Sequence, residues 1–291
     1  MCVIIDSLGN RADNAGKGST MTERQAEIIH ELGVVPTIEP LMEFEKRAAF
    51  LAAYLAHTGL RGFVLGISGG QDSLLAGLIA QRAVELRRQA GYEASFHAAL
   101  LPYGIQADRD DALLAVITIK PDFTYDLDIK PTVDAFAVSF ETAVCEALAD
   151  FDKGNAKARA RMIAQYAIAG RHKLLVLGTD HAAEAVTGFY TKYGDGGADV
   201  LPLAGLSKRQ GRQILASLAV PTVFTTKAPT ADLLDSKPGQ ADETELGLSY
   251  DQIDDYLEGK TVDDSTAARI EARYDATWHK RALPVALTTA S

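Results

Sequence analysis

A glycine-rich turn of eight residues is the first feature of this chain that could do chemistry. The turn, Gly66-Ile67-Ser68-Gly69-Gly70-Gln71-Asp72-Ser73, lies between the apolar run 63–65 and a helix-like stretch that begins at Leu74. Adjacent glycines let backbone N–H groups close around an anion, and the first turn of a helix adds unpaired N–H donors at the positive end of its dipole. The serine hydroxyls donate as well. The turn therefore predicts a binding site for the pyrophosphate part of a nucleotide.

The residue types in this turn also indicate which phosphate reacts. A phosphate loop that transfers the terminal phosphoryl group has Lys before its Ser or Thr, but Asp72 occupies that position here. A carboxylate there can instead hold Mg²⁺ against the phosphates. A loop that grips the outer two phosphates as a departing unit leaves the α-phosphate open to attack, so we predict adenylation with release of pyrophosphate. We expect Asp72 to be a surface residue that contributes little to stability.

The composition is that of a globular protein that buries a full core. The chain has 291 residues, of which 47% are hydrophobic, and a formal net charge of −10. The acidic balance argues against a general nucleic-acid surface, and no run of about eighteen apolar residues indicates a membrane span. Cys2 and Cys145 are the only cysteines, so we expect no disulfide framework and a cytoplasmic location. We expect Cys145 to be packed in a helix rather than reactive.

The elements around the turn alternate between short apolar runs and longer helical patterns. We predict strands at Phe63–Ile67, Ser95–Leu101, Phe123–Leu127 and Leu174–Leu177. We predict helices at Thr22–Glu31, Pro40–His57, Leu74–Ala90, Ala107–Val116, Thr132–Ala149 and Ala156–Ala169. This alternation indicates an α/β, Rossmann-like fold: a doubly wound, mainly parallel sheet with helices on both faces. Ligands of such sheets bind beyond the carboxyl ends of the strands, so the turns after Ile67, Leu101 and Leu177 should face one site.

We divide the chain into a flexible N-terminal arm at 1–20 and a single domain at 21–291. The arm is rich in Gly, Asn and Ser and has no periodicity, and Thr22 with Gln25 resembles a capping box at the start of the domain. Two segments of the domain, 190–203 and 228–246, break the helical pattern with Gly, Asp and Pro, and we expect mobile loops there. A lid that substrate orders and simple disorder are both open interpretations of 228–246.

Five further segments follow the turn in the order of a known enzyme family. They are Gly154-Asn155-Ala156-Lys157-Ala158-Arg159, Gly178-Thr179-Asp180-His181-Ala182-Ala183-Glu184, Tyr193-Gly194-Asp195-Gly196-Gly197-Ala198-Asp199, Leu206-Ser207-Lys208-Arg209-Gln210 and Lys227-Ala228-Pro229-Thr230-Ala231-Asp232-Leu233. With them the chain, from about Glu23 to Arg281, resembles ammonia-dependent NAD synthetases of the N-type ATP pyrophosphatase group. The resemblance implies an adenine nucleotide alpha-hydrolase-like fold and one ATP-pyrophosphatase/NAD synthetase domain.

The resemblance also implies a specific amidation. The nicotinate carboxylate of deamido-NAD attacks the α-phosphate of ATP, pyrophosphate leaves, and ammonia then displaces AMP to give NAD. This chemistry explains the turn, because a carboxylate and ammonia only form a salt in water unless a good leaving group is supplied. Such an enzyme is a ligase that forms a carbon–nitrogen bond in the last step of NAD biosynthesis, with ATP as co-substrate and Mg²⁺ as cofactor.

Individual residues receive roles from the same resemblance. ATP would contact Gly66, Ile67, Ser68, Gly69, Gly70, Gln71, Asp72, Ser73, Thr179, Lys208 and Thr230. Deamido-NAD would contact Arg159, Lys192, Asp199, His279 and Lys280. The Mg²⁺ ligands would be Asp72 and Glu184. Asp195 would hold and deprotonate ammonia and Lys208 would neutralise charge on the phosphates, which makes these two the expected catalytic residues.

Gln106, which follows Gly104 at the end of the second predicted strand, should also face the nucleotide. The family forms homodimers with substrate sites at the interface, and apolar faces at Ala135–Ala149 and Ala156–Ala169 are consistent with a homodimer here. We expect no nucleic-acid or membrane partner. Because only about sixty residues precede Gly66, which is short for a glutaminase domain, we expect Cys2 not to be a glutaminase nucleophile. The nitrogen source would then be free ammonia or ammonia from a separate protein.

Two other hypotheses remain open at this point. One is a tRNA-modifying enzyme that adenylates its substrate with the same kind of turn, and the acidic balance argues against it. The other is a regulator that binds ATP without turning it over, which the fold alone does not exclude. Asp72, Glu184 and Asp195 have no evident purpose in such a regulator.

Overall fold

A four-stranded parallel sheet forms the centre of the computed structural model, which describes residues 21–105, 108–227, 230–231, 235 and 240–287. The strands are β1 (Gly62–Gly66), β2 (Ser95–Leu100), β3 (Phe123–Asp126) and β4 (Leu175–Val176), in the order β3-β2-β1-β4. In register, β1 pairs Phe63 with Phe96 of β2 and with Leu175 of β4. A single parallel bridge between Leu177 and Val200 continues the sheet beyond β4.

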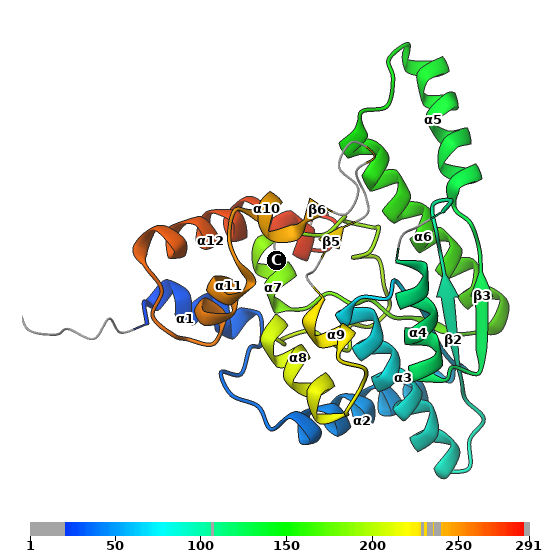
Figure 1. Ribbon diagram of the computed structural model, residues 1–291, viewed down its shortest axis with the longest axis horizontal. Helices are drawn as coiled ribbons and strands as arrows, with labels where there is room; N and C mark the ends of the chain where they lie inside the picture. Colours follow the sequence, from blue (N-terminus) through cyan, green and yellow to red (C-terminus); the bar gives the residue numbers. More distant parts are fainter. Residues whose placement is uncertain (1–20, 106–107, 228–229, 232–234, 236–239, 288–291) are drawn as a thin grey trace, which may run out of the picture.

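Helices cover both faces of this sheet (Figure 1). The helices are α1 (Glu23–Glu31), α2 (Pro40–Thr58), α3 (Gln71–Gln89), α4 (Arg109–Ile119), α5 (Lys130–Val144), α6 (Asp150–His172), α7 (Ala182–Thr187), α8 (Lys208–Ser217), α9 (Val223–Thr226), α10 (Asp242–Leu246), α11 (Tyr250–Leu257), α12 (Asp264–Ala276) and α13 (Trp278–Arg281). A small antiparallel pair, β5 (Thr230–Ala231) and β6 (Gln240–Ala241), precedes α10. The doubly wound, mainly parallel α/β fold predicted from the sequence is confirmed.

Alternate residues of β1 face opposite layers of the core. Phe63 and Leu65 pack in one cluster with the buried sides of α2, α3 and α4, whereas Val64 packs in a second cluster with α6 and with Val133 of α5. All three β1 side chains are at most 2% exposed. Because a strand directs successive side chains to opposite faces, a continuous apolar run is what a strand covered on both sides requires.

The order of the strands creates a crevice beside β1. The chain runs from β1 through α3 to β2 and through α4 to β3 on one face, and then crosses by α5 and α6 on the other face to reach β4. β1 therefore lies between two strands that the chain reaches in opposite directions. In sheets of this kind the crevice beyond the carboxyl ends of the two central strands is where ligands bind.

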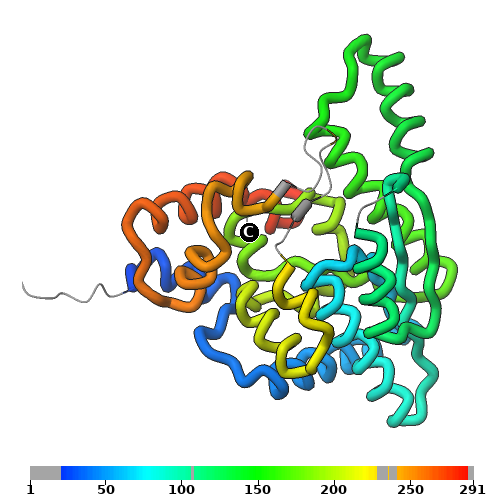
Figure 2. Tube along the Cα trace, viewed as in Figure 1, coloured from blue at the N-terminus to red at the C-terminus, as the bar shows by residue number. Residues whose placement is uncertain are grey.

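A third apolar cluster lies away from the sheet. It joins Ile28 of α1 to Val186 of α7, Tyr256 of α11 and Ile270 of α12. Figures 1 and 2 show these helices gathered at the side of the molecule opposite β2 and β3, although α1 and α12 are far apart in the sequence. α7 directly follows β4, so this cluster is packed against the segment that borders the crevice.

Some predicted element boundaries were wrong. The helix predicted at Thr132–Ala149 ends at Val144, because Cys145 adopts a left-handed conformation with a φ of 61°. The next helix begins at Asp150, earlier than the predicted Ala156–Ala169, and acidic residues in its first turn suit the positive end of the helix dipole. Cys145 is exposed, so the expectation that it is packed was also wrong.

The predicted capping box at Thr22 and Gln25 is only half formed. The Thr22 hydroxyl accepts a hydrogen bond from the Gln25 amide at 3.1 Å, as an N-cap should. The Gln25 side chain instead donates to the carbonyl of Tyr256 at 2.7 Å and is buried against α11. Among the described residues, no helix is both long enough and apolar enough to cross a membrane.

Candidate functional site

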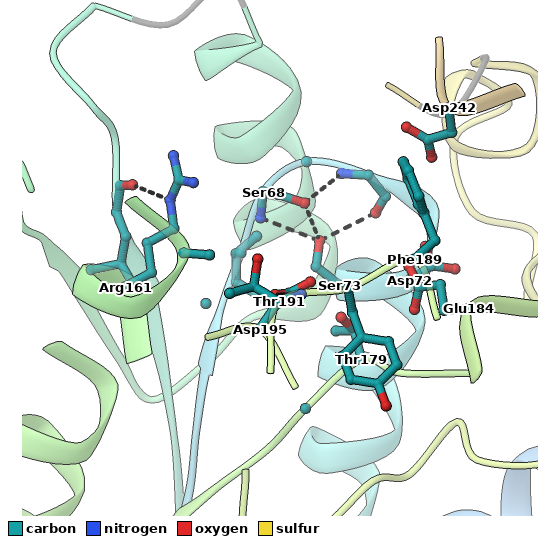
Figure 3. Close-up of a pocket in the computed structure, with 18 of the residues that line it drawn as sticks. Ser68, Asp72, Ser73, Arg161, Thr179, Glu184, Phe189, Thr191, Asp195 and Asp242 are labelled. Atoms are coloured by element: carbon teal, nitrogen blue, oxygen red, sulfur yellow. Dashed lines mark hydrogen bonds between the residues drawn. The ribbon is translucent and has the colours of Figure 1, made fainter. Parts of the chain in front are cut away.

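The turns that follow β1, β2 and β4 open onto one cavity of about 600 Å³. Figure 3 shows side chains from the turns after β1 and β4 and from α7 directed into it. The expected site residues that line the cavity are Gly66, Ile67, Ser68, Gly69, Gly70, Gln71, Asp72, Ser73, Thr179, Glu184, Asp195, Lys208 and Lys280. The expectation that the turns after Ile67, Leu101 and Leu177 face one site is confirmed, since Leu101 and Leu177 belong to the same lining.

The two serines of the glycine-rich turn hold its conformation. Ser68 Oγ lies 3.1 Å from Ser73 Oγ and accepts from the Gly70 amide at 3.3 Å, and Ser73 Oγ donates to the Gly70 carbonyl at 3.3 Å. Gly70 is the N-cap of α3 and has no side chain to cap the helix. The turn therefore directs the N-terminus of α3 at the cavity, where its amides and dipole favour an anion.

Gly69 is required by conformation and by space. Its φ is +80°, and a β-carbon there would lie 2.5 Å from the backbone nitrogen of Ala112 in α4. A side chain at this position would push α4 away from the turn. At the start of the turn, the Gly66 amide donates to Gln165 Oε1 of α6 at 2.8 Å, so α6 fixes the end of β1.

A buried ion pair lies at the centre of the cavity wall. Lys208 Nζ is 2.6 Å from Asp72 Oδ2, and the two side chains are 5% and 20% exposed. The expectation that Asp72 is a simple surface residue was therefore wrong. Burial raises the pKa of Asp72, but the charge and the hydrogen bond of Lys208 oppose burial, and that pKa lies below its usual value. Burial works against the charge of Lys208, yet Asp72 and Glu184 hold the pKa of this lysine above its usual value.

Helix α8 positions Lys208 from its first turn. Ser207 and Gln210 form a reciprocal capping box at the N-terminus of α8. The Lys208 amide donates to Asp254 Oδ1 at 2.9 Å, which anchors this end of α8 to α11. The ammonium group lies 5.0 Å from the centre of the Tyr250 ring, so the lysine is held between an aromatic face and a carboxylate.

Three side chains next to the turn have the spacing of a metal site. One ligand atom each of Asp72, His181 and Glu184 lie within 4.8 Å of one another. Burial raises the pKa of Glu184 well above its usual value, and the charges of Asp72 and Asp180 raise it further. Two carboxylates beside a phosphate-binding turn are the hard oxygen donors that Mg²⁺ uses, and a divalent cation would relieve their repulsion. The residues therefore fit Mg²⁺.

A second pair of carboxylates, Asp180 and Asp195, lies near enough to Glu184 to affect its pKa. Burial, with the charge of Asp195 added, raises the pKa of Asp180 to about 8, and Asp180 Oδ1 has no hydrogen-bond partner among the described residues. Asp195 lines the cavity, and its carboxylate accepts a hydrogen bond from the Thr191 amide at 2.8 Å. Burial raises the pKa of Asp195. The charges of Lys280 and Arg161 oppose the rise in the pKa of Asp195 but do not cancel it.

The remaining expected residues do not line the cavity. The Arg159 guanidinium donates to the Lys192 carbonyl at 3.4 Å, and the Lys192 ammonium donates to the His279 carbonyl. Each of these three residues is next in sequence to a residue that lines the cavity. The Asp199 carboxylate accepts from the Val176 amide at 2.8 Å and from the Tyr166 hydroxyl at 3.1 Å. Gln106 and the side chain of Thr230 fall outside the described residues.

Sequence reasoning missed the roles of Asp180, His181 and Gln165. His181 is the N-cap of α7 and Glu184 is its third residue, a spacing that the sequence does display. Asp180 lies four residues after the end of β4, in the turn where polar residues of parallel sheets gather. Gln165 lies in the middle of a long helix, and nothing in the sequence indicates that it reaches β1.

Comparisons with known proteins identify relatives along most of the chain. The family model described as NAD synthase matches residues 43–284. A curated relative from Bacillus licheniformis, the NH(3)-dependent NAD(+) synthetase, is 61% identical over 90% of this chain and 97% of its own length. The solved NAD+ synthetase of Burkholderia pseudomallei is 49% identical, with a TM-score of 0.78 over 90% of this chain and 97% of that one. The NMN synthetase of Francisella tularensis is 34% identical, with a TM-score of 0.76 over 86% and 99%.

Removing one partner of the central ion pair should destabilise the fold more than removing both. Asp72→Ala leaves the Lys208 ammonium buried without its carboxylate, so we expect a loss of about 3 kcal/mol in the free energy of unfolding. Adding Lys208→Met should restore at least half of that loss. Urea denaturation measures the free energy of unfolding of the single and the double variant. The control is Asp251→Ala, which removes an exposed partner of Arg209 and should change stability by less than about 0.5 kcal/mol. Equal losses in the single and double variants would contradict this account.

The raised pKa of Asp180 makes a pH-dependent contribution to stability. Above the usual carboxyl pKa, 3.8, the unfolded chain has lost this proton while the folded chain keeps it up to about pH 8. Folding then takes up a proton, so the contribution is lost as the pH rises from about 4 to about 8. Asp180→Asn removes this loss. The difference between the melting temperatures of the variant and of the wild type should therefore become more positive from pH 5 to pH 8.5. A difference that stays constant, as we expect for Asp251→Asn, would show that Asp180 is not buried as a neutral acid.

Proposed function

Because the chain belongs to the NAD synthase family, we infer that its cavity carries out the ATP-dependent amidation of deamido-NAD with ammonia. The nicotinate carboxylate attacks the α-phosphate of ATP, the α–β bond breaks, and pyrophosphate leaves. Ammonia then attacks the carbonyl of the adenylate, AMP leaves, and one proton is released. The family assignment sets aside the tRNA-modifying and regulatory hypotheses.

One observation carries the assignment of ATP to this cavity. The N-terminus of α3, the hydroxyl groups of Ser68 and Ser73, and the Lys208 ammonium all border the same space beside β1. Amides, hydroxyl groups and a cation are the groups that bind a polyphosphate. The Asp at position 72, where a terminal phosphoryl transferase has Lys, supports binding of the outer phosphates as a leaving group.

Asp72 and Glu184 are the proposed Mg²⁺ ligands. When bound, Mg²⁺ would neutralise phosphate charge and orient the departing pyrophosphate. Because Lys208 is in direct contact with Asp72 Oδ2, we expect the two side chains to separate when Mg²⁺ binds. The freed ammonium remains beside the turn, where it stabilises charge that builds up on the phosphates as the carboxylate attacks.

Asp195 and Asp180 are the proposed ammonia site. Asp195 lines the cavity, and Asp180 has a free carboxylate oxygen behind it. An ammonium ion would bring a further positive charge and N–H donors to this pair. Its proton must leave before the nitrogen attacks, and a carboxylate with a raised pKa is a suitable acceptor.

Of the proposed contacts to deamido-NAD, one lines the cavity and four do not. Lys280 lines the cavity, whereas Arg159, Lys192 and His279 adjoin lining residues. Cationic side chains suit the diphosphate of a dinucleotide that extends out of the cavity, and Asp199 suits ribose hydroxyl groups.

We also propose that the chain forms a homodimer through α5, α6 and β3. Of the fifteen residues of α5, the only buried one is Val133. Large apolar side chains on these elements are exposed: Phe123, Phe136, Val138, Val144, Phe151, Ile163 and Tyr166. An apolar helix that buries so little of its own surface is typical of an interface. Figure 1 shows α5 projecting from the body of the molecule, where a second copy can reach it.

The activity test follows both half-reactions. Without ammonium, the enzyme with ATP, Mg²⁺ and deamido-NAD should exchange labelled pyrophosphate into ATP. With ammonium, it should form AMP and NAD. Nicotinate mononucleotide is the competing acid, because a related structure is that of an NMN synthetase, and we expect it to react at least tenfold more slowly. Asp195→Asn should reduce amidation by about 100-fold while exchange continues. Loss of both half-reactions together would contradict the ammonia role of Asp195.

The dimer test uses one charge in the exposed apolar face. Phe136→Glu should shift sedimentation at micromolar concentration from dimer to monomer, because a dimer would bury this carboxylate. The control is Met42→Glu. Met42 is exposed on α2, which packs on the face of the sheet opposite α6, so this variant should remain a dimer. A wild-type chain that sediments as a monomer would contradict the proposal.

A further inference from the structure

His181 is a buried side chain in the candidate metal site, and its Nε2 atom takes no part in capping α7. It is 3% exposed, and its Nε2 atom lies 3.8 Å from Asp72 Oδ1 and 3.7 Å from Glu184 Oε2. Nε2 has no hydrogen-bond partner among the described residues. A buried polar atom without a partner, directed at two carboxylates, indicates that it contacts something in the working enzyme.

The other ring nitrogen determines what Nε2 can do. As the N-cap of α7, His181 accepts the Glu184 amide proton on Nδ1 at 3.4 Å. An accepting Nδ1 carries a lone pair, so the proton of the neutral ring is on Nε2. A protonated Nε2 cannot bind a metal ion. It can only donate a hydrogen bond, and the atoms it faces are carboxylate oxygens.

The surroundings of the ring favour this orientation, with Nδ1 as the acceptor and Nε2 as the donor. A ring flip would take the cap away from α7, whose first turn carries Glu184. The Tyr250 ring packs edge-on against the imidazole, with centroids 6.5 Å apart. The ring is therefore held between the amide that it caps and the two carboxylates that it faces.

We propose that His181 is a positioning residue whose Nε2–H donates to Asp72 and Glu184, so that these carboxylates bind the cation through oxygen alone. This inference rests on the proposed metal site. One ligand atom each of Asp72, His181 and Glu184 lie within 4.8 Å of one another. With its proton on Nε2, His181 is not a ligand, so the site differs from the histidine–carboxylate sites that bind Fe²⁺ or Zn²⁺. Outer hydrogen bonds of this type orient metal-binding carboxylates, and the donor also relieves their repulsion before the cation arrives.

Two substitutions separate the two ring nitrogens. His181→Asn keeps an acceptor near Nδ1 that can cap α7 but removes the Nε2 donor. His181→Gln places an amide donor near Nε2. The matched control is His97→Gln, which changes another buried histidine outside the cavity. Thermal unfolding checks that all three variants fold.

The readout is Mn²⁺ binding, measured by electron paramagnetic resonance with α,β-methylene-ATP, which cannot release pyrophosphate. We expect His181→Asn to weaken Mn²⁺ binding by about 10- to 100-fold, His181→Gln to recover part of that loss, and His97→Gln to bind as wild type does. Wild-type affinity in His181→Asn would overturn the proposal.

Electron spin-echo envelope modulation of the bound Mn²⁺ tests the tautomer without any variant. We expect no coupling to an imidazole nitrogen, and a coupling that disappears in [¹⁵N]histidine-labelled protein would overturn the proposal. The proposed metal site is tested separately by Glu184→Gln. If this variant and wild type bind Mn²⁺ equally, the metal site itself is wrong, whereas a loss only in Glu184→Gln would reject His181 alone.

Discussion

The structure depends on keeping several acidic side chains together at the carboxyl edge of a parallel sheet. Asp72 follows β1, whereas Asp180 and Glu184 follow β4, and the pairing of these two strands brings the carboxylates close together. In a site that excludes much of the water, such carboxylates repel one another. Two responses are visible: Lys208 lies against Asp72, and the pKa values of Asp180 and Glu184 are raised. In the proposed reaction, Mg²⁺ and ammonium replace the lysine charge and the protons.

The helical cluster beside the sheet makes this arrangement possible. Lys208 belongs to the first turn of α8, whose end is anchored by Asp254 of α11. α7 has one side in the same apolar cluster, while its first turn carries Glu184 toward the cavity. The cluster thus holds the cation on one side and a carboxylate on the other. A sheet edge alone would supply the acidic groups without the lysine that offsets them.

Much of the architecture could be predicted because it is encoded by local patterns. The apolar runs of β1 and β2 read as buried strands, and the spacing of Phe44, Ala48 and Leu51 predicted a helix whose face is buried. The glycine-rich turn could be interpreted from residue types because anion binding uses backbone amides, which are available wherever glycine allows. Prediction failed where a long-range contact decided the outcome. Asp72 was taken for a surface residue because its partner lies 136 positions later in the chain.

The sequence by itself determined the class of fold, the turn that receives phosphates and, through its six motifs, the family. Only the tertiary structure decided which carboxylates have raised pKa values, that Lys208 lies beside Asp72, and that His181 faces both proposed metal ligands. The physical reason is the range of the forces involved. Hydrophobic periodicity and backbone conformation act within a few residues, whereas charge state depends on every group within several ångströms, and such neighbours come from anywhere in the chain.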